Sequence, residues 1–311
     1  MRSVISTLVA IVLLALGLYF IYPASRPPLA TIEKSSPPVK TQSAEKILPI
    51  VDLLTAEPEQ GEALIARFSQ EPKEVLLDGE VVRDFAYGGE WRVVFPLSLS
   101  ARVGEHSLVV NFGEKRIEKV FQVLEKDRQI ITLVVPKKLK QTPSQLTKSL
   151  SKTNASIADV VAEVSEQAYF RQPFALPVSE KAIISSPFGE TRKTVAADPS
   201  QSSDEQDIVH LGVDFDVEEG TEIRAINAGV VAASYVDPVY GQSVIVDHGQ
   251  GIFSLYLHLS ERRISEGEQV EKGQLVGLAG QTGLSSAPHL HLSIKINGQS
   301  VDPLAFIEGF R

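Results

Sequence analysis

The chain has 311 residues, which is enough for about two domains with linkers. Its formal net charge is −9, and this argues against nucleic acid as a partner because phosphate binding needs a basic face. Cysteine is absent, so disulfides, thiolate metal sites and a cysteine nucleophile are excluded. Any bound metal ion must therefore be held by histidine and carboxylate side chains.

An uncharged, mostly apolar run follows Arg2 and continues to Tyr22. About 20 such residues are enough to cross the hydrocarbon core of a membrane. The positive end should stay in the cytoplasm, so we expect residues 1–22 to be a single-pass anchor in the cell membrane. The bulk of the chain then lies outside the cytoplasm, in the periplasm or at the cell surface. The alternative is a cleaved signal segment, which would make the protein secreted.

Residues 23–45 are rich in proline and serine and predict a disordered linker. Residues 46–136 then alternate short β runs with turn signals, among which Asp78-Gly79 predicts a hairpin. This spacing predicts a small β-sandwich, immunoglobulin-like in its architecture. His106 has no partner motif nearby, and we expect it at the surface or at a strand edge.

A helical spacer is predicted within residues 137–172. Thr142 and Pro143 form a helix start signal, with threonine as the N-cap and proline in the first turn. Apolar residues at helical spacing predict one packed face, and the segment from Phe170 to Pro173 is expected to end the helix. The stripe consists of Ile157, Val160, Val161 and Val164.

Residues 173–311 read as a second β-rich domain, with many short apolar runs separated by glycine. Residues two or four apart on a strand face the same side of a sheet. His289 and His291 should therefore share a face, and so should Tyr256 and His258. His210 and Asp214 converge in the same way if their segment is extended.

Zinc fits this set of side chains, because it accepts imidazole and carboxylate ligands. A catalytic zinc site commonly has three protein ligands and leaves the fourth position to water. From spacing alone, the ligands are His210, Asp214 and one of the pair His289 and His291. The spacing does not say which member of the pair binds the metal.

The order of these motifs resembles that of the lysostaphin-type (LytM-type) zinc metallopeptidases, over about residues 183–306. The resemblance implies a β-rich groove called a duplicated hybrid motif, and hydrolysis of peptide bonds in bacterial peptidoglycan. The motifs that carry it are His210-x-Gly-x-Asp214, Tyr256-Leu-His-Leu259 and Pro288-His-Leu-His291, with flanking Ser186-Pro-Phe-Gly189, Tyr240-Gly241, Asp247-His-Gly249, Gly280-Gln-Thr-Gly283 and Val301-Asp-Pro303.

Carried over by position, the resemblance makes His210, Asp214 and His291 the zinc ligands. It makes His258 and His289 catalytic histidines that do not bind the metal. One of them would accept a proton from the attacking water, and the other would hydrogen-bond the oxyanion of the tetrahedral intermediate. We read His248, in an Asp-His-Gly turn, as structural.

The stretch between Gly189 and His210 departs from the family pattern. It lacks the Arg-x-His-Pro run of many relatives, and its acidic, serine-rich composition predicts a mobile loop at the groove edge. The expected function is a membrane-tethered zinc metalloendopeptidase acting on peptidoglycan peptides. The alternative is a non-catalytic regulator of the same family that activates a cell-wall amidase. Such regulators generally lack part of the metal set, whereas this sequence fills all five positions.

Overall fold

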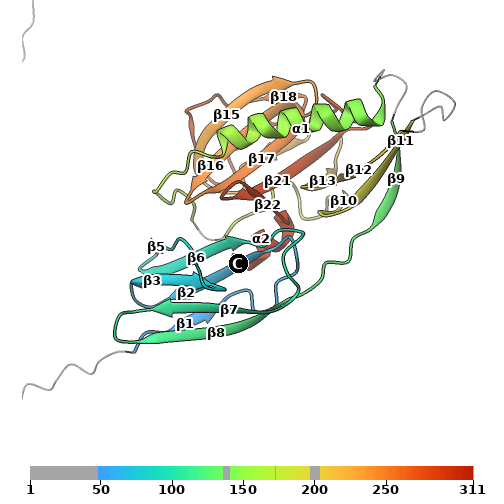
Figure 1. Cartoon of the computed structure of the whole chain (residues 1–311). Coiled ribbons are helices and arrows are strands. Elements are labelled where there is room, and N and C mark those ends of the chain that lie inside the picture. The colour runs from blue at the N-terminus through green and yellow to red at the C-terminus, as the bar shows by residue number, and fades with distance from the viewer. Residues whose placement is uncertain (1–47, 136–140, 172, 197–203, 311) are drawn as a thin grey trace, which may run out of the picture. The chain divides into compact units, whose positions relative to one another are not determined.

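The computed structural model of the chain describes residues 48–135, 141–171, 173–196 and 204–310, and residues 48–311 form one compact unit (Figure 1). The predicted anchor at residues 1–22 and the linker at 23–45 lie outside the described residues. No helix in the described part of the chain is both long and apolar enough to cross a membrane. The division into five segments stays a prediction.

A β-sandwich begins the described chain, and its two four-stranded sheets enclose one apolar core. The predicted hairpin is confirmed, because Asp78 and Gly79 both have positive φ, as a type I′ turn requires. The immunoglobulin-like detail stays a prediction. In sheet order the strands are β1 (Val51–Leu53), β2 (Ala63–Phe68), β6 (Glu90–Pro96) and β5 (Phe85–Tyr87), then β4 (Glu80–Val81), β3 (Glu74–Leu77), β7 (Gly104–Asn111) and β8 (Arg116–Val123).

His106 is buried, so the prediction of a surface or strand-edge histidine is wrong. It lies on β7, between two neighbouring strands. Its Nδ1 is 2.5 Å from an Asp78 carboxylate oxygen, and its Nε2 is 2.7 Å from the carbonyl oxygen of Arg102. Asp78 lies 28 residues earlier in the chain, so the local sequence around His106 did not reveal this partner. The ring also stacks on Phe121.

The stretch predicted as a mobile loop contains two paired strands, and that part of the prediction is wrong. β11 (Thr191–Ala196) and β12 (Glu205–Val209) form an antiparallel hairpin. β9 (Ile130–Val135) pairs with β11 in parallel and completes a three-stranded sheet. The partner strand lies about 60 residues earlier in the chain, so composition alone could not reveal the pairing.

Helix α1 (Pro143–Val160) begins at the predicted N-cap, where Thr142 and Gln145 form a capping box. It ends ten residues before Phe170, so the predicted end of the helix is wrong. The segment leaves the helix because Phe170 is buried among aromatic rings, with Phe174 at 5.4 Å between ring centroids. The main chain at Tyr169 is held there by a hydrogen bond from its N–H to the carbonyl oxygen of His248.

An eight-stranded sheet carries the C-terminal half of the chain, which is mainly β throughout. Helix α2 (Pro303–Gly309) follows the last strand of this sheet. Three further strands of the same half, β14 (Glu222–Arg224), β20 (Leu275–Leu278) and β18 (Glu261–Arg262), form a separate small sheet. The large sheet runs β10 (Ile183–Ser186), β13 (Val213–Asp216), β21 (His289–Ile296), β17 (Ile252–Leu259), β16 (Gly241–Gly249), β15 (Gly229–Asp237) and β19 (Gln269–Val270), with β22 (Gln299–Val301) paired to β21.

The two faces of this sheet have different partners. One face is packed into the main core, with Tyr256 and Leu292 fully buried. On the other face, Phe253, Leu255 and Leu257 pack with residues of α1 and of the turn that follows it. Figure 1 shows α1 running across this second face.

His248 lies in the main-core region, away from the other histidines of the domain. Its Nδ1 donates to the carbonyl oxygen of Ala228, and its Nε2 is 2.8 Å from the hydroxyl of Ser254. Burial lowers the pKa of His248 to about 4, so the ring is neutral at pH 7. The structural reading of this histidine agrees with these contacts.

The low pKa of His248 predicts acid sensitivity. The unfolded chain takes up this proton near pH 6.5, whereas the folded chain resists it until about pH 4, so stability is lost as the pH falls between these values. From pH 7 to pH 5 the loss should be about 2 kcal/mol. Urea unfolding of wild type and His248→Gln at both pH values measures it. A variant that loses as much stability as the wild type would contradict the assignment.

Candidate metal centre and active site

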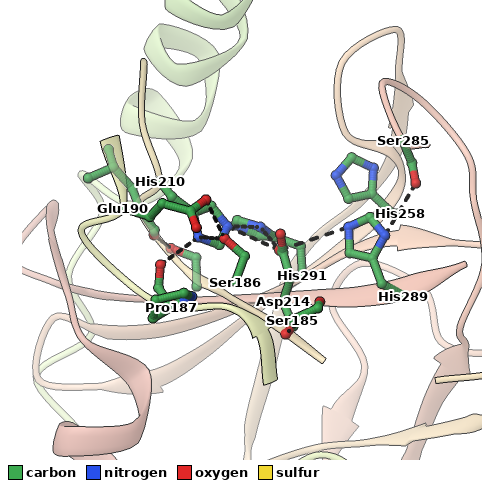
Figure 2. A network of polar contacts seen from close by, with 12 residues as sticks. Ser185, Ser186, Pro187, Glu190, His210, Asp214, His258, Ser285, His289 and His291 are labelled. Atoms are coloured by element: carbon green, nitrogen blue, oxygen red, sulfur yellow. Dashed lines mark hydrogen bonds and ion pairs between the residues drawn. The ribbon is translucent and has the colours of Figure 1, made fainter. Parts of the chain in front are cut away.

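Three predicted ligands come together on the second face of the large sheet. β13 and β21 are adjacent and antiparallel, and their register sets Asp214 directly opposite His291. His210 follows β12, where its N–H bonds to the carbonyl oxygen of Glu190 and its own carbonyl accepts from Gly189 N–H. These backbone bonds turn the imidazole of His210 toward the strand pair, as Figure 2 shows.

The ligand atoms of the three residues lie close together, and all three side chains are buried. Asp214 Oδ1 is 2.7 Å from His291 Nδ1 and 3.0 Å from His210 Nε2. The two imidazole nitrogens are themselves 3.0 Å apart. One carboxylate oxygen and two ring nitrogens therefore face one another across a single small space.

This donor set fits a zinc ion. Zinc takes imidazole nitrogen and carboxylate oxygen at about 2.0–2.1 Å in tetrahedral geometry, which puts neighbouring ligand atoms about 3.3 Å apart. The observed separations of 2.7–3.0 Å need only a slight expansion to reach that value. His210 is also in the right tautomer, because its Nδ1 donates to the carbonyl oxygen of Pro187 at 2.9 Å and leaves Nε2 unprotonated.

Gly212 makes room for His291. A Cβ atom at this position would lie 2.4 Å from His291 Nε2 and 2.5 Å from the carbonyl oxygen of Leu292. Both contacts are far too short, and the carbonyl belongs to a paired strand that cannot easily move. The glycine between His210 and Asp214 is therefore part of the ligand geometry.

Gly212→Ala is expected to weaken zinc binding by about 10- to 100-fold, because the new methyl group displaces the imidazole of His291. Competition with a chelator of known affinity measures the change. Gly309→Ala is the matched control, since its Cβ would meet only side-chain methyl groups, Ile65 Cδ1 at 3.0 Å and Thr55 Cγ2 at 3.4 Å, and neither residue lines the cavity. Equal zinc affinity in the two variants would contradict this role for Gly212.

A polar network behind the ligands was missed by the sequence reasoning. Arg192 donates from Nη2 to Asp214 Oδ2 at 2.9 Å, and from Nε to a carboxylate oxygen of Glu190 at 2.9 Å. Ser186 joins both, since its hydroxyl donates to Glu190 and accepts from Arg192. One oxygen of Asp214 is thus fixed by arginine, and the other faces the histidines. The only sequence signal was the Ser-Pro-Phe-Gly motif, because Arg192 lay in the presumed loop.

The surroundings of Asp214 and His291 favour the protonation states in which these side chains can bind a metal ion. Burial alone would raise the pKa of Asp214, but His291 and His210 beside it hold this pKa well below its usual range. Burial lowers the pKa of His291 to about 4. At neutral pH the group therefore consists of an ionised carboxylate and a neutral imidazole at His291.

His258 reaches the site through an irregularity in β17. Its φ is +61°, and the pairing of β16 with β17 shifts register at this point. The expectation that Tyr256 and His258 share a face is wrong for this reason. Tyr256 points into the core, where its hydroxyl accepts from the N–H of Ile226, while the ring of His258 lies 4.9 Å from that of His289. A bulge that redirects one side chain is common beside active sites.

His258 and His289 are held in matching ways. The Nδ1 of His258 donates to the carbonyl oxygen of Thr282 at 2.8 Å, and the Nδ1 of His289 donates to that of Ala287 at 2.9 Å. A carbonyl can only accept, so each Nε2 is unprotonated when the ring is neutral. Burial, followed by the neighbouring histidines, lowers the pKa of His258 to about 3. The Nε2 of His289 is 3.9 Å from Asp214 Oδ1.

These residues line a cavity of about 530 Å³, which extends well beyond the His210, Asp214 and His291 group. One wall comes from α1, whose Asn154 accepts a hydrogen bond from the hydroxyl of Tyr240 at 2.9 Å. β9 and β12 also line the cavity, so a strand from the end of the predicted β-sandwich segment takes part. Apart from Asn154, the residues that these elements contribute to the lining are apolar: Ile131, Leu133, Val135, Leu146, Leu150, Ile157, Ile208 and Val209.

A β-sheet cavity with a His-Asp-His group and two further anchored histidines has the parts that a metal-dependent hydrolase requires. Comparison with known families agrees, because residues 208–303 match Peptidase family M23. Residues 208–303 are therefore a Peptidase M23 domain, and the resemblance found in the sequence is confirmed.

Individual relatives support the same assignment. An uncharacterized metalloprotease of Haemophilus influenzae is 36% identical over 129 residues, which cover 41% of this chain and 26% of the relative. The DD-carboxypeptidase/endopeptidase Mpg of Neisseria meningitidis serogroup B is 39% identical over 97 residues, covering 31% of this chain and 22% of Mpg. The chain thus spans about a quarter of the length of these relatives.

A solved structure matches over more of the chain. It is that of a putative peptidase M23 from Pseudomonas aeruginosa, which is 28% identical. The match has a TM-score of 0.59 and covers 83% of this chain and 98% of the other. The fold of the chain is that of an M23 peptidase, as predicted from the β-rich pattern and the motif order.

Proposed function

We propose that the protein is a zinc-dependent metalloendopeptidase that hydrolyses peptide bonds of peptidoglycan outside the cytoplasm. The observation that carries the proposal is the convergence of His210, Asp214 and His291 within one cavity, beside two histidines whose Nδ1 atoms are held by backbone carbonyls. The names of relatives support the substrate class, since they include a peptidoglycan DD-endopeptidase of Vibrio cholerae and lysostaphin.

Zinc would be held by His210 Nε2, Asp214 Oδ1 and His291 Nδ1. When bound, it would supply a Lewis acid that makes water acidic enough to ionise near neutral pH and polarises the carbonyl of the substrate. The carboxylate of Asp214 is kept in place by Arg192, and the ring of His210 by the carbonyl of Pro187. No glutamate among the described residues lies next to the ligands in the cavity except Glu190, which is bound by Arg192 and Ser186.

Proton handling therefore falls to His258 and His289. One of these rings takes the proton of the attacking water on its Nε2 and passes it to the leaving amine. The other, once it has taken up a proton from solvent on its Nε2, donates a hydrogen bond to the oxygen that becomes negative in the transition state. Both rings are fixed by backbone carbonyls, so neither needs to reorient during the reaction.

The location outside the cytoplasm is supported by the sequence alone. The apolar run from residue 3 to residue 22 follows Arg2 and has the length of a single membrane span. Peptidoglycan lies on the far side of that membrane, where an anchored domain could reach it. Protease accessibility of the intact protein in spheroplasts would test this placement, since only an exported domain is cut.

Digestion of purified peptidoglycan, followed by mass analysis of the products, tests the proposed activity. We expect new amino termini within the peptide portion, and none after treatment with a chelator. A protein that binds no zinc and releases no peptide, but accelerates a cell-wall amidase, would instead be the non-catalytic regulator. The filled metal set favours the enzyme over that regulator.

A further inference from the structure

Lys295 lies on the floor of the same cavity as the histidines. It follows His289, His291 and Ser293 at alternate positions of β21, and all four line the cavity. Alternate residues of a strand face one side of a sheet. Four residues of strand separate Lys295 from His291 by about 13 Å, which is the length of a short stretch of extended peptide.

The ammonium group of Lys295 has no carboxylate partner among the described residues. Within them, its Nζ donates a hydrogen bond to the hydroxyl oxygen of Ser300 at 2.9 Å. Arg192, the other cation that lines the cavity, is bound to Glu190 and Asp214. Of these two cations, Lys295 is therefore the one without an ion pair among the described residues, and it can pair with an anionic group of a ligand.

The surroundings of Lys295 make a charge there costly without a partner. β17 places Phe253 opposite it on one side, and β22 places the buried Ser300 opposite it on the other. Burial lowers the pKa of the Lys295 ammonium, with no other cause recorded. An anion beside the ammonium would offset this cost.

We propose that Lys295 and Ser300 form a subsite for a carboxylate of the substrate, about 13 Å along the groove from the metal group. The ammonium supplies the charge, and the Ser300 hydroxyl, which accepts from Lys295, keeps its own proton to donate. The inference rests on the proposed function, because it assigns the subsite to a peptide that carries a free carboxylate as well as the bond to be cut.

A negative and a positive side chain lie at opposite ends of the cavity along β21. Asp216 lies opposite His289 near one end of β21, and Lys295 lies near the other. Both line the cavity, with the metal group between them. A peptide that placed its carboxylate at Lys295 would present a fixed peptide bond to His258 and His289, so the subsite would determine which bond is cut.

Binding can be measured without hydrolysis by using the zinc-loaded His258→Ala protein as the parent. The probe is a cross-linked stem peptide released from purified peptidoglycan, compared with the same peptide after carbodiimide amidation of its carboxylates. We expect amidation to weaken calorimetric binding to the parent about tenfold. Adding Lys295→Met should weaken binding of the unmodified peptide about as much as amidation does, and amidation should then have no further effect. Lys295→Arg should retain both the binding and its sensitivity to amidation.

Lys181→Met is the matched control, because Lys181 is exposed and does not line the cavity. Thermal unfolding confirms that each variant is folded. The subsite is overturned if amidation weakens binding equally with lysine and methionine at position 295, or if neither peptide binds the parent. Hydrolysis by the native protein is scored separately. If the native protein hydrolysed no peptide while binding still depended on Lys295, the proposed function would be refuted and the subsite would stand.

Discussion

His258→Ala should lower kcat/KM for peptidoglycan peptides by about 100- to 1000-fold while one zinc ion stays bound. The ring is not assigned as a ligand, since it lies 4.9 Å from the ring of His289 and is not part of the His210, Asp214 and His291 group. Removing it takes away either the proton acceptor or the donor to the oxyanion. Steady-state hydrolysis and elemental analysis of the same preparation give both quantities.

Ser285→Ala is a useful comparison for this variant. Ser285 Oγ lies 3.2 Å from His289 Nδ1, but the carbonyl of Ala287 holds the same nitrogen more closely. Its loss should therefore reduce the rate much less than the loss of His258. A His258→Ala protein that hydrolysed substrate at the wild-type rate would refute the proposed mechanism.

His291→Ala should abolish both zinc binding and hydrolysis. Only His210 and Asp214 would remain, and a catalytic zinc site normally has three protein ligands. The variant also leaves Asp214 with one fewer partner, because His291 Nδ1 is its nearest histidine contact at 2.7 Å. Elemental analysis should find close to no zinc after dialysis.

His248→Gln serves as the control histidine for the metal measurement. It lies in the core, bound to Ala228 and Ser254, and should keep a full equivalent of zinc. If His291→Ala also kept a full equivalent, the ligand assignment would be wrong. The two substitutions together separate a lost ligand from a lost core residue.

The convergence of His210, Asp214 and the His289-x-His291 strand could be expected from local spacing in the sequence. His210 and Asp214 belong to one short segment, and His289 and His291 alternate on one strand. The choice of His291 over His289 needed the family resemblance. The structure supplies the physical basis, since the register of β13 with β21 sets Asp214 opposite His291.

Features that depend on distant pairing could not be read from the sequence. The face of His258 follows from a positive φ and a register shift, which no alternation rule predicts. Arg192 reaches Asp214 only because β9 and β12 hold β11 in place. The wall formed by α1 likewise depends on where the helix packs, although its start at Thr142 and Pro143 was clear from the capping residues.

The most direct test of the account is a zinc titration of the chelator-treated protein, with the rate of peptide release from peptidoglycan measured after each addition. We expect the rate to rise with added zinc and to stop rising at one equivalent per chain, because one ion completes the His210, Asp214 and His291 group. A rate that did not depend on zinc, or no release of peptide at any zinc level, would contradict it.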